Sequence, residues 1–134
     1  MDFTDKRVLI TGGTRGIGFG VAEAFLAAGA CVAINGKTEG SVNAAIEKLE
    51  NNECLAAAPG DVSTVAGCEL TVKTAEDGFG GLDVLVNSAS IYYQKPFEEL
   101  IEEDWDRNLA VNAKAPFLLA RRIAPGMKSR GRGK

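Results

Sequence analysis

The feature that most constrains the fold is a repeated alternation between short apolar runs and longer segments with helical periodicity. The apolar runs lie at 7–11, 31–35, 54–58 and 83–87. Each run has the length of a strand and is followed by apolar residues three and four positions apart, as on one face of a helix. This order predicts an α/β chain of three layers (αβα), with a parallel sheet, right-handed crossovers and helices on both faces.

The expected helices can be placed from the same periodicity. One begins near Gly16 and ends before Gly29, and the next two carry the apolar positions of 42–49 and 65–79. A fourth helical pattern extends from Glu98 to about Met127. We find no internal linker or repeat, so residues 1–134 are expected to form a single domain.

Composition limits the function classes that this chain can belong to. The chain has 134 residues, a formal net charge of -3 and no histidine. Its mild acidity argues against nucleic acid as a partner, and the short basic tail at 128–134 lacks aromatic residues for base stacking. The absence of histidine removes the commonest metal ligand and general base, and we expect no metal site.

The cysteines and the apolar content predict the compartment. Cys31, Cys54 and Cys68 are odd in number and lack close C-x-x-C spacing, so we expect free thiols in a reducing environment. No apolar run approaches the length of a bilayer span, and the charged N-terminus does not resemble a signal peptide. The expectation is therefore a cytoplasmic protein with no membrane segment.

Glycines interrupt the chain between the first apolar run and the first helix, within Leu9–Gly18. In a parallel sheet this turn lies at the carboxyl edge, where ligands bind. Glycine lets the backbone approach a diphosphate without a Cβ in the way, and the helix that follows directs unpaired N–H groups toward an anion. Gly12, Gly16 and Gly18 do not have the spacing of the common G-x-G-x-x-G motif, and no Walker lysine follows. A dinucleotide site is predicted, with a glycine-rich connection that binds nothing as the alternative.

Residues 11–18 resemble the cofactor loop of the classical short-chain dehydrogenases/reductases. Further motifs similar to those of that family follow in its order: Asp-Val at 61–62, Asn-Ser-Ala-Ser at 87–90 and Val-Asn at 111–112. The resemblance covers essentially the whole chain and is to the N-terminal, cofactor-binding half, nearest to 3-oxoacyl-acyl-carrier-protein reductases and pteridine reductases. It implies a Rossmann-like fold, truncated after the fourth strand and the following long helix. It also implies hydride transfer between NADP(H) and a small-molecule carbonyl or alcohol substrate.

The end of the second apolar run bears on the choice of cofactor. A carboxylate at this place binds the ribose 2′-OH of NAD, whereas positive charge suits the 2′-phosphate of NADP. Residues 35–38 are Asn-Gly-Lys-Thr, without an acid, and Arg15 lies on the same side of the expected pocket. Lys37 and Arg15 therefore predict NADP in preference to NAD. The alternative is that both are ordinary solvated charges.

The resemblance implies the other cofactor contacts. Asp61 resembles the residue that hydrogen-bonds the adenine amino group, with Val62 packing near the ring, although an Asp that caps the following turn is an alternative. Ser88 and Ser90 replace the second Asn and the Gly of the family motif, and Ser90 adds a side chain near the expected nicotinamide ribose. The expected cofactor-binding residues are Thr11, Gly12, Thr14, Arg15, Gly16, Ile17, Gly18, Lys37, Asp61, Val62, Asn87 and Ala89.

Asn112 resembles the asparagine of the family's catalytic tetrad, whose main-chain carbonyl holds a water of the proton relay. Pro116 has no N–H to donate to the carbonyl four residues earlier, and its ring crowds that carbonyl. We therefore expect the Asn112 carbonyl to be free for water and the helix to kink. A tolerated Asn and Pro without catalytic meaning are the alternative.

The family's catalytic serine, and its tyrosine with a lysine four residues later, have no counterpart in these residues. Tyr92 and Tyr93 lie only three and two positions before Lys95, in the loop after the fourth apolar run. We expect little or no turnover from this chain. The alternative function is a non-catalytic dinucleotide-binding module.

The C-terminal stretch 127–134 corresponds to the connection that leads into a fifth strand in the family. Without that strand, one edge of the fourth strand is expected to be unpaired. The expected consequences are marginal solubility, homo-oligomerisation through this edge or through the last long helix, or a longer reading frame of which this chain is a part.

Overall fold

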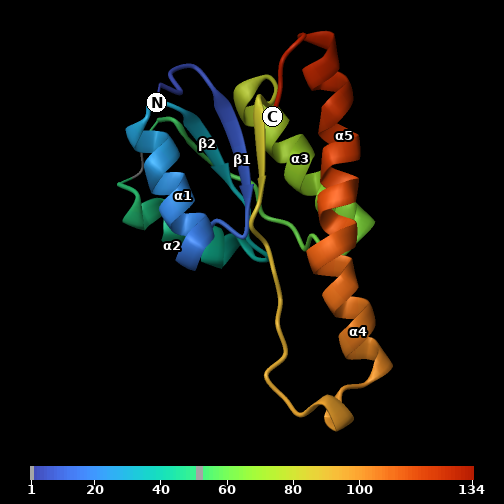
Figure 1. Ribbon diagram of the computed structural model, residues 1–134. Helices are drawn as coiled ribbons and strands as arrows, with labels where there is room; N and C mark the ends of the chain where they lie inside the picture. The colour runs from blue at the N-terminus through green and yellow to red at the C-terminus, as the bar shows by residue number, and fades with distance from the viewer. Residues whose placement is uncertain (1, 51–52) are drawn as a thin grey trace.

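The computed structural model of the protein describes residues 2–50 and 53–134 (Figure 1). Strands and helices alternate as the apolar pattern predicts, and each strand lies within one residue of its predicted bounds. The strands are β1 (Arg7–Thr11), β2 (Cys31–Ile34), β3 (Leu55–Ala57) and β4 (Val84–Asn87). The helices are α1 (Gly16–Ala27), α2 (Glu39–Lys48), α3 (Val65–Phe79), a 3-10 turn (Phe97–Glu99), α4 (Glu102–Leu109), a π-helical turn (Ala110–Lys114) and α5 (Ala115–Ser129).

The four strands form a parallel sheet in the order β3-β2-β1-β4. Val8 of β1 lies opposite Val32 on one side and Val84 on the other. Helices α1 and α2 cover one face of the sheet, and α3 and α5 cover the other (Figure 1). The predicted three-layer, Rossmann-like α/β arrangement is confirmed, and the carboxyl ends of all four strands meet at one edge.

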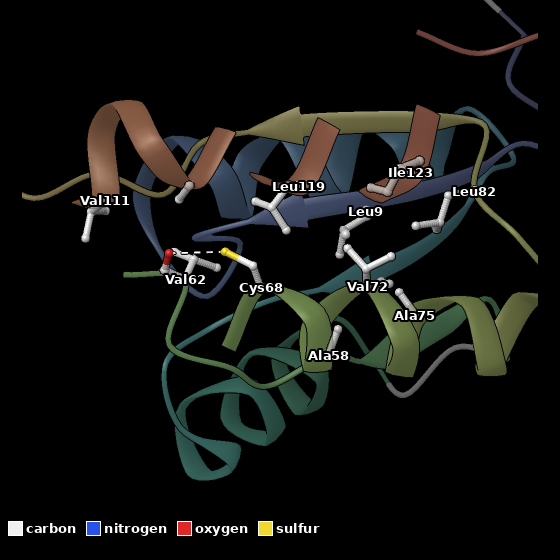
Figure 2. Packing of buried hydrophobic residues seen from close by; sticks show 12 residues of the cluster. Leu9, Ala58, Val62, Cys68, Val72, Ala75, Leu82, Val111, Leu119 and Ile123 are labelled. Carbon is white, nitrogen blue, oxygen red and sulfur yellow. Dashed lines mark hydrogen bonds between the residues drawn. The ribbon is translucent and has the colours of Figure 1, made fainter. Parts of the chain in front are cut away.

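The core consists of two apolar clusters, one on each face of the sheet. Alternate side chains of β1 enter different clusters, as strand geometry requires: Val8 and Ile10 face α1 and α2, and Leu9 faces α3 and α5. Figure 2 shows the second cluster, where Leu9 lies among Val72, Leu119 and Ile123. These buried contacts fix the sheet between its helices and so fix the turns at its carboxyl edge.

Cys68 of α3 is a buried free thiol at the border of this second cluster. Its sulfur donates to the carbonyl oxygen of Val62 at 3.2 Å (Figure 2). Burial raises the pKa of the Cys68 thiol, so it stays protonated at neutral pH. The prediction of a free thiol is confirmed for Cys68.

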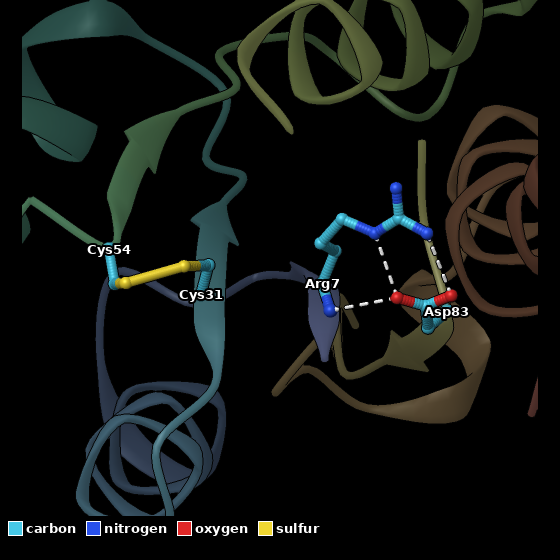
Figure 3. The surroundings of a disulfide bond; sticks show 4 residues. All are labelled: Arg7, Cys31, Cys54 and Asp83. Carbon is cyan, nitrogen blue, oxygen red and sulfur yellow. Dashed lines mark hydrogen bonds and ion pairs between the residues drawn. A yellow bond between two sulfur atoms is a disulfide. The ribbon is translucent and has the colours of Figure 1, made fainter. Parts of the chain in front are cut away.

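Cys31 and Cys54 form a disulfide, with Cα atoms 4.2 Å apart (Figure 3). The expectation that these two are free thiols is therefore wrong. The reason lies in the strand register: Val32 pairs with Leu55, so the residues immediately before them are neighbours across β2 and β3. The disulfide lies at the amino ends of the strands, at the opposite edge of the sheet from the glycine turn.

The amino ends of β1 and β4 are joined by an ion pair between Arg7 and Asp83 (Figure 3). The Arg7 Nε and Nη2 atoms donate to the two carboxylate oxygens at 2.8 and 2.9 Å. The Asp83 side chain is only 4% exposed, and the neighbouring Arg7 guanidinium holds its pKa well below the usual range. A nearly buried carboxylate is thus fully paired.

The segment predicted as one helix from Glu98 to Met127 is divided in the structure. Helix α4 ends at Leu109, a π-helical turn follows, and α5 begins at Ala115. The Ala115 N–H donates to the carbonyl of Ala110, five residues back rather than four. The regular α-helical pattern is therefore interrupted beside Pro116, which has no N–H to continue it.

The outer edge of β4 carries the last residue of the chain. The Lys134 N–H donates to the Asp83 carbonyl at 3.0 Å, and the Leu85 N–H donates to the Lys134 carbonyl at 2.9 Å. The edge that was expected to be unpaired is thus partly paired at its start. Within residues 2–50 and 53–134, no helix combines the length and apolar character needed to cross a bilayer.

Candidate functional site

A pocket of about 900 Å³ opens at the carboxyl edge of the sheet. Its walls come from the turns after the strands, the start of α1 and one side of α2, together with Arg107 of α4 and Val111 of the π-helical turn. Most of the residues predicted from the sequence meet there. Those that line it are Gly12, Thr14, Arg15, Gly16, Ile17, Gly18, Lys37, Asp61, Val62 and Ala89.

The floor of the pocket is a turn in which backbone packs directly on backbone. Gly12 has a φ of 63°, and a Cβ placed on it would lie 2.7 Å from the Cα of Ala89. A Cβ on Gly18 would lie 2.3 Å from the carbonyl oxygen of Gly12. Both approaches are shorter than a side chain tolerates, so the turn requires glycine at these positions.

Helix α1 begins at Gly16, directly beside this turn. Its N-cap residue, Arg15, has an extended backbone and forms no side-chain cap hydrogen bond. The first N–H groups of the helix and the positive end of its dipole therefore remain available for an anion in the pocket. The arrangement suits a diphosphate whose oxygens are bound by main-chain N–H groups.

Two of the predicted cofactor-binding residues, Thr11 and Asn87, do not line the pocket and lie instead at the ends of β1 and β4, opposite each other. The Thr11 Oγ1 atom accepts hydrogen bonds from the N–H groups of Ser88 and Ala89 at 3.2 and 3.1 Å. This side chain therefore fixes the loop after β4 to the glycine turn. In the structure Thr11 positions the wall of the pocket.

Asn35, directly after β2, is a structural residue that the sequence interpretation did not identify. It is buried, and its Nδ2 atom donates to the Ala58 carbonyl at 2.9 Å and to the Thr71 hydroxyl at 3.0 Å. These bonds join the ends of β2 and β3 to α3. The sequence showed that residues 35–38 include no acid. It could not show the hydrogen bonds of Asn35, because these join segments that are distant in the chain.

Lys37 and Asp61 face each other at the same end of the pocket. The Lys37 Nζ atom lies 2.8 Å from Asp61 Oδ2. The other carboxylate oxygen accepts from the Ser63 N–H at 3.0 Å and from the Ser63 hydroxyl at 2.6 Å. Lys37 and Ser63 together lower the pKa of Asp61 to about 2, so this carboxylate is ionised at neutral pH.

The hydrogen bonds of Asp61 bear on its two predicted roles. Its contacts with Ser63 form the turn before α3, which matches the capping alternative. Helix α3 itself is capped by Thr64, whose hydroxyl accepts from the Gly67 N–H at 3.0 Å. The contact of Asp61 with adenine stays a prediction.

Asn112 holds the loop after β4 through its side chain. Its Oδ1 atom accepts from the Ile91 N–H, and its Nδ2 atom donates to the Ile91 carbonyl, both at 2.9 Å. Asn108, one helical turn earlier, accepts from Asn112 Nδ2 at 3.1 Å and donates to the same carbonyl at 3.3 Å. The predicted role of the Asn112 carbonyl stays a prediction, but its amide plainly positions Ile91, which lines the pocket.

Replacing Asn112 by alanine is expected to release this loop. The variant loses both hydrogen bonds to Ile91, each worth about 1 kcal/mol, so amide exchange at Ile91 and its neighbours should become roughly ten times faster or more. Hydrogen-exchange mass spectrometry of the peptides that cover 88–95 measures this. Asn43→Ala, at an exposed position of α2 on the other face of the sheet, is the control. Equal protection in the Asn112 variant and the control would contradict the assignment.

The tyrosines after β4 lie apart from any arrangement suited to proton transfer. Lys95 forms an ion pair with Asp104 of α4, and its Nζ lies 5.8 Å from the centre of the Tyr93 ring. Tyr92 is 79% exposed. None of these four side chains lines the pocket. Among the residues that the structure describes, no group of three His, Cys, Asp or Glu side chains is placed to hold a metal ion.

Some lining residues carried no signal in the sequence. Arg107, Ser41 and Lys48 line the pocket because helices bring them there. Arg107 in particular lies five positions before Asn112 and belongs to no motif noted above. Its position became visible only when α4 was placed beside the loop after β4.

Known proteins share this sequence and architecture. Residues 6–134 match the family model described as short chain dehydrogenase. An oxidoreductase of Thermotoga maritima is 42% identical over 134 residues, and 5-keto-D-gluconate 5-reductase of Escherichia coli is 38% identical over 130. The alignments cover 99% and 96% of this chain but 53% and 51% of those proteins, so the chain spans about half the length of these relatives.

A solved structure gives the same result. L-sorbose reductase from Gluconobacter frateurii, complexed with NADPH and L-sorbose, has a TM-score of 0.89 and 30% identity to this chain. The match covers 98% of this chain and 51% of that protein. The residues matched by the family model include the glycine turn and every strand described above. The chain therefore belongs to the short-chain dehydrogenase family.

Proposed function

We propose that residues 1–134 are the NADP(H)-binding portion of a short-chain dehydrogenase/reductase that acts on a small-molecule carbonyl or alcohol. The observation that carries the proposal is the turn at Gly12 and Gly18, where no Cβ fits and the uncapped start of α1 faces the pocket. When bound, NADPH supplies a hydride. The chain's own residues supply the binding surface for the nucleotide.

Different residues of the pocket suit different parts of the nucleotide. The N–H groups at the start of α1 suit the diphosphate. Arg15 and Lys37 both line the pocket, and no carboxylate stands at residues 35–38 to favour an unmodified ribose, which supports NADP over NAD. Val62 and Ala89 offer apolar contact for the rings. The NADPH complex of L-sorbose reductase supports the same preference.

The cofactor preference is tested by Lys37→Met. This substitution removes the charge but keeps much of the side-chain length, so NADPH affinity should fall about five- to tenfold while NADH affinity stays within a factor of two. Titration of each nucleotide by calorimetry measures both dissociation constants. Lys73→Met, on α3 outside the pocket, removes the same unit of charge and is the control. An equal loss for both nucleotides would contradict a contact with the 2′-phosphate.

The resemblance to the family implies that turnover needs a catalytic tyrosine with a lysine four positions later. The sequence has no tyrosine with a lysine four positions later. A non-catalytic dinucleotide-binding module remains the second candidate for the chain by itself, supported by the same absence. Both candidates require the same nucleotide site, which is why binding is the property to measure first.

Self-association is the proposed partner interaction. Large apolar side chains are exposed on α4 and α5, with Trp105 66%, Leu109 43% and Phe117 61% exposed. An exposed apolar stripe of this kind supports contact with a second copy through the last helices. The partly paired edge of β4 makes that edge the weaker candidate.

A further inference from the structure

The ion pair between Lys37 and Asp61 gives Asp61 a role beyond adenine binding or turn formation. We propose that Asp61 is a specificity-determining residue, which limits the preference of the pocket for 2′-phosphorylated nucleotides by competing with the phosphate for Lys37. The inference rests on the proposed NADP(H) site and adds a restraint on its selectivity. Asp61 changes how strongly the pocket prefers NADPH over NADH, and NADPH stays the preferred nucleotide.

The two side chains meet inside the pocket. Lys37 follows β2 and Asp61 follows β3, and these strands are neighbours in the sheet. The Nζ and Oδ2 atoms are 2.8 Å apart, and both residues line the pocket. The cation that the 2′-phosphate needs is therefore already bound to an anion of the same chain.

Asp61 is the fixed member of the pair. Its Oδ1 atom is held by the Ser63 N–H and hydroxyl, and its main-chain carbonyl accepts from Thr64. Helix α3 also packs tightly against this residue, because a Cβ on Gly67 would lie 1.9 Å from the Asp61 carbonyl oxygen. The Lys37 side chain is 61% exposed and has a flexible stem, so the lysine must move when a phosphate binds.

The competition persists at neutral pH. Lys37 and Ser63 lower the pKa of Asp61 to about 2, so the carboxylate remains charged in the range where nucleotides are bound. A 2′-phosphate near Lys37 must draw the ammonium away from Asp61 or share it at the cost of repulsion between two anions. The 2′-hydroxyl of NADH is uncharged, so it neither draws Lys37 away from Asp61 nor is repelled by the Asp61 carboxylate.

Arg15 limits the size of the effect. It lines the same pocket, and it takes part in none of the ion pairs found within residues 2–50 and 53–134. A phosphate can therefore bind Arg15 without displacing a carboxylate. Asp61 thus weakens the preference for NADPH without abolishing it.

The test compares nucleotide selectivity in Asp61→Asn with that in the unchanged chain. Asparagine keeps an Oδ1 acceptor for Ser63, so the turn before α3 can persist while the negative charge is lost. Dissociation constants for NADPH and NADH are measured by calorimetry, and their ratio is the readout. Both nucleotides carry the same adenine, so a weaker interaction with adenine in the variant changes both constants equally and leaves the ratio unaffected.

We expect Asp61→Asn to raise the preference for NADPH over NADH about three- to fivefold, the scale of a partly exposed ion pair. In the Lys37→Met background the same substitution should change the ratio less than twofold. Asp77→Asn, which removes an equal charge from an exposed ion pair on α3 outside the pocket, should leave the ratio unchanged.

The outcomes separate this inference from the proposed function. If the unchanged chain binds neither nucleotide, the proposed function fails and the inference fails with it. If the chain binds NADPH but Asp61→Asn leaves the ratio unchanged, or shifts it equally with and without Lys37, the inference is overturned and the proposed function stands. Circular dichroism of each variant shows whether the fold is retained.

Discussion

Gly18→Ala is expected to weaken NADPH binding by tenfold or more and to destabilise the fold. The added Cβ would lie 2.3 Å from the Gly12 carbonyl oxygen and 3.0 Å from the Ser88 hydroxyl. The backbone oxygen cannot yield without moving the glycine turn, so α1 must shift away from β1 and its N–H groups lose their place in the pocket. Calorimetric titration with NADPH measures the loss, since a tenfold change corresponds to about 1.4 kcal/mol.

Gly20→Ala is the matched control for this substitution. Gly20 lies two residues further along α1, is exposed, and has no atom within 4 Å of the position its Cβ would take. Alanine there should leave NADPH affinity unchanged and stabilise the helix by about 0.5 to 1 kcal/mol. If both alanine variants bound NADPH as well as the unchanged chain does, the glycine turn would not be the diphosphate site.

Asp83→Ala is expected to lower the free energy of unfolding by about 3 kcal/mol. The substitution leaves Arg7 without the carboxylate that it contacts at 2.8 and 2.9 Å, and it removes the tie between the amino ends of β1 and β4 (Figure 3). Urea denaturation followed by circular dichroism measures the change. Asp77→Ala, which breaks an exposed ion pair with Lys73, is the control and should cost less than about 1 kcal/mol.

The Asp83 carboxylate also predicts that the free energy of unfolding depends on pH. Because Arg7 lowers the pKa of Asp83 in the folded state, the stabilisation is fully present above the unfolded pKa of about 4 and is lost as the pH falls below it. Asp61 acts in the same direction, since its pKa is lowered to about 2. Unfolding free energy should thus decrease as the pH falls from about 4 to about 2, and less steeply in Asp83→Ala. Equal slopes for the two proteins would contradict the ion pair.

The strands and the glycine turn were accessible from the sequence because their signals are local. A run such as Arg7–Thr11 is apolar over the length of a buried strand, and Gly12, Gly16 and Gly18 mark the turn that follows it. The carboxyl edge of a parallel sheet then brings together turns that are distant in the chain. Most of the predicted cofactor residues line one pocket for this reason.

What the sequence did not provide depends on register and on long-range contacts. The disulfide of Cys31 and Cys54 follows from the pairing of Val32 with Leu55, which no local pattern specifies. The ion pair of Lys37 with Asp61 likewise requires β2 and β3 to be neighbours. Each residue had a predicted role, but the contact between them was not foreseen.

The last helices contain one feature that a local sequence signal indicated and one that depends on contacts between distant residues. Pro116 indicated an interruption, because proline cannot supply the N–H that a regular helix needs, and a π-helical turn ends two residues before it. The bonds from Asn108 and Asn112 to Ile91 were not predicted, because they join the helix to a loop some twenty residues earlier. A motif identified Asn112, and only the structure shows what its side chain holds.

Calorimetric titration of the 134-residue chain with NADPH is the most direct measurement of whether main-chain N–H groups at the glycine turn hold a dinucleotide diphosphate. We predict saturable binding of one NADPH per chain, retained in Gly20→Ala and abolished or weakened at least tenfold in Gly18→Ala. The absence of saturable heat for NADPH and NADH with the folded chain would contradict the assignment of this pocket as a nucleotide site.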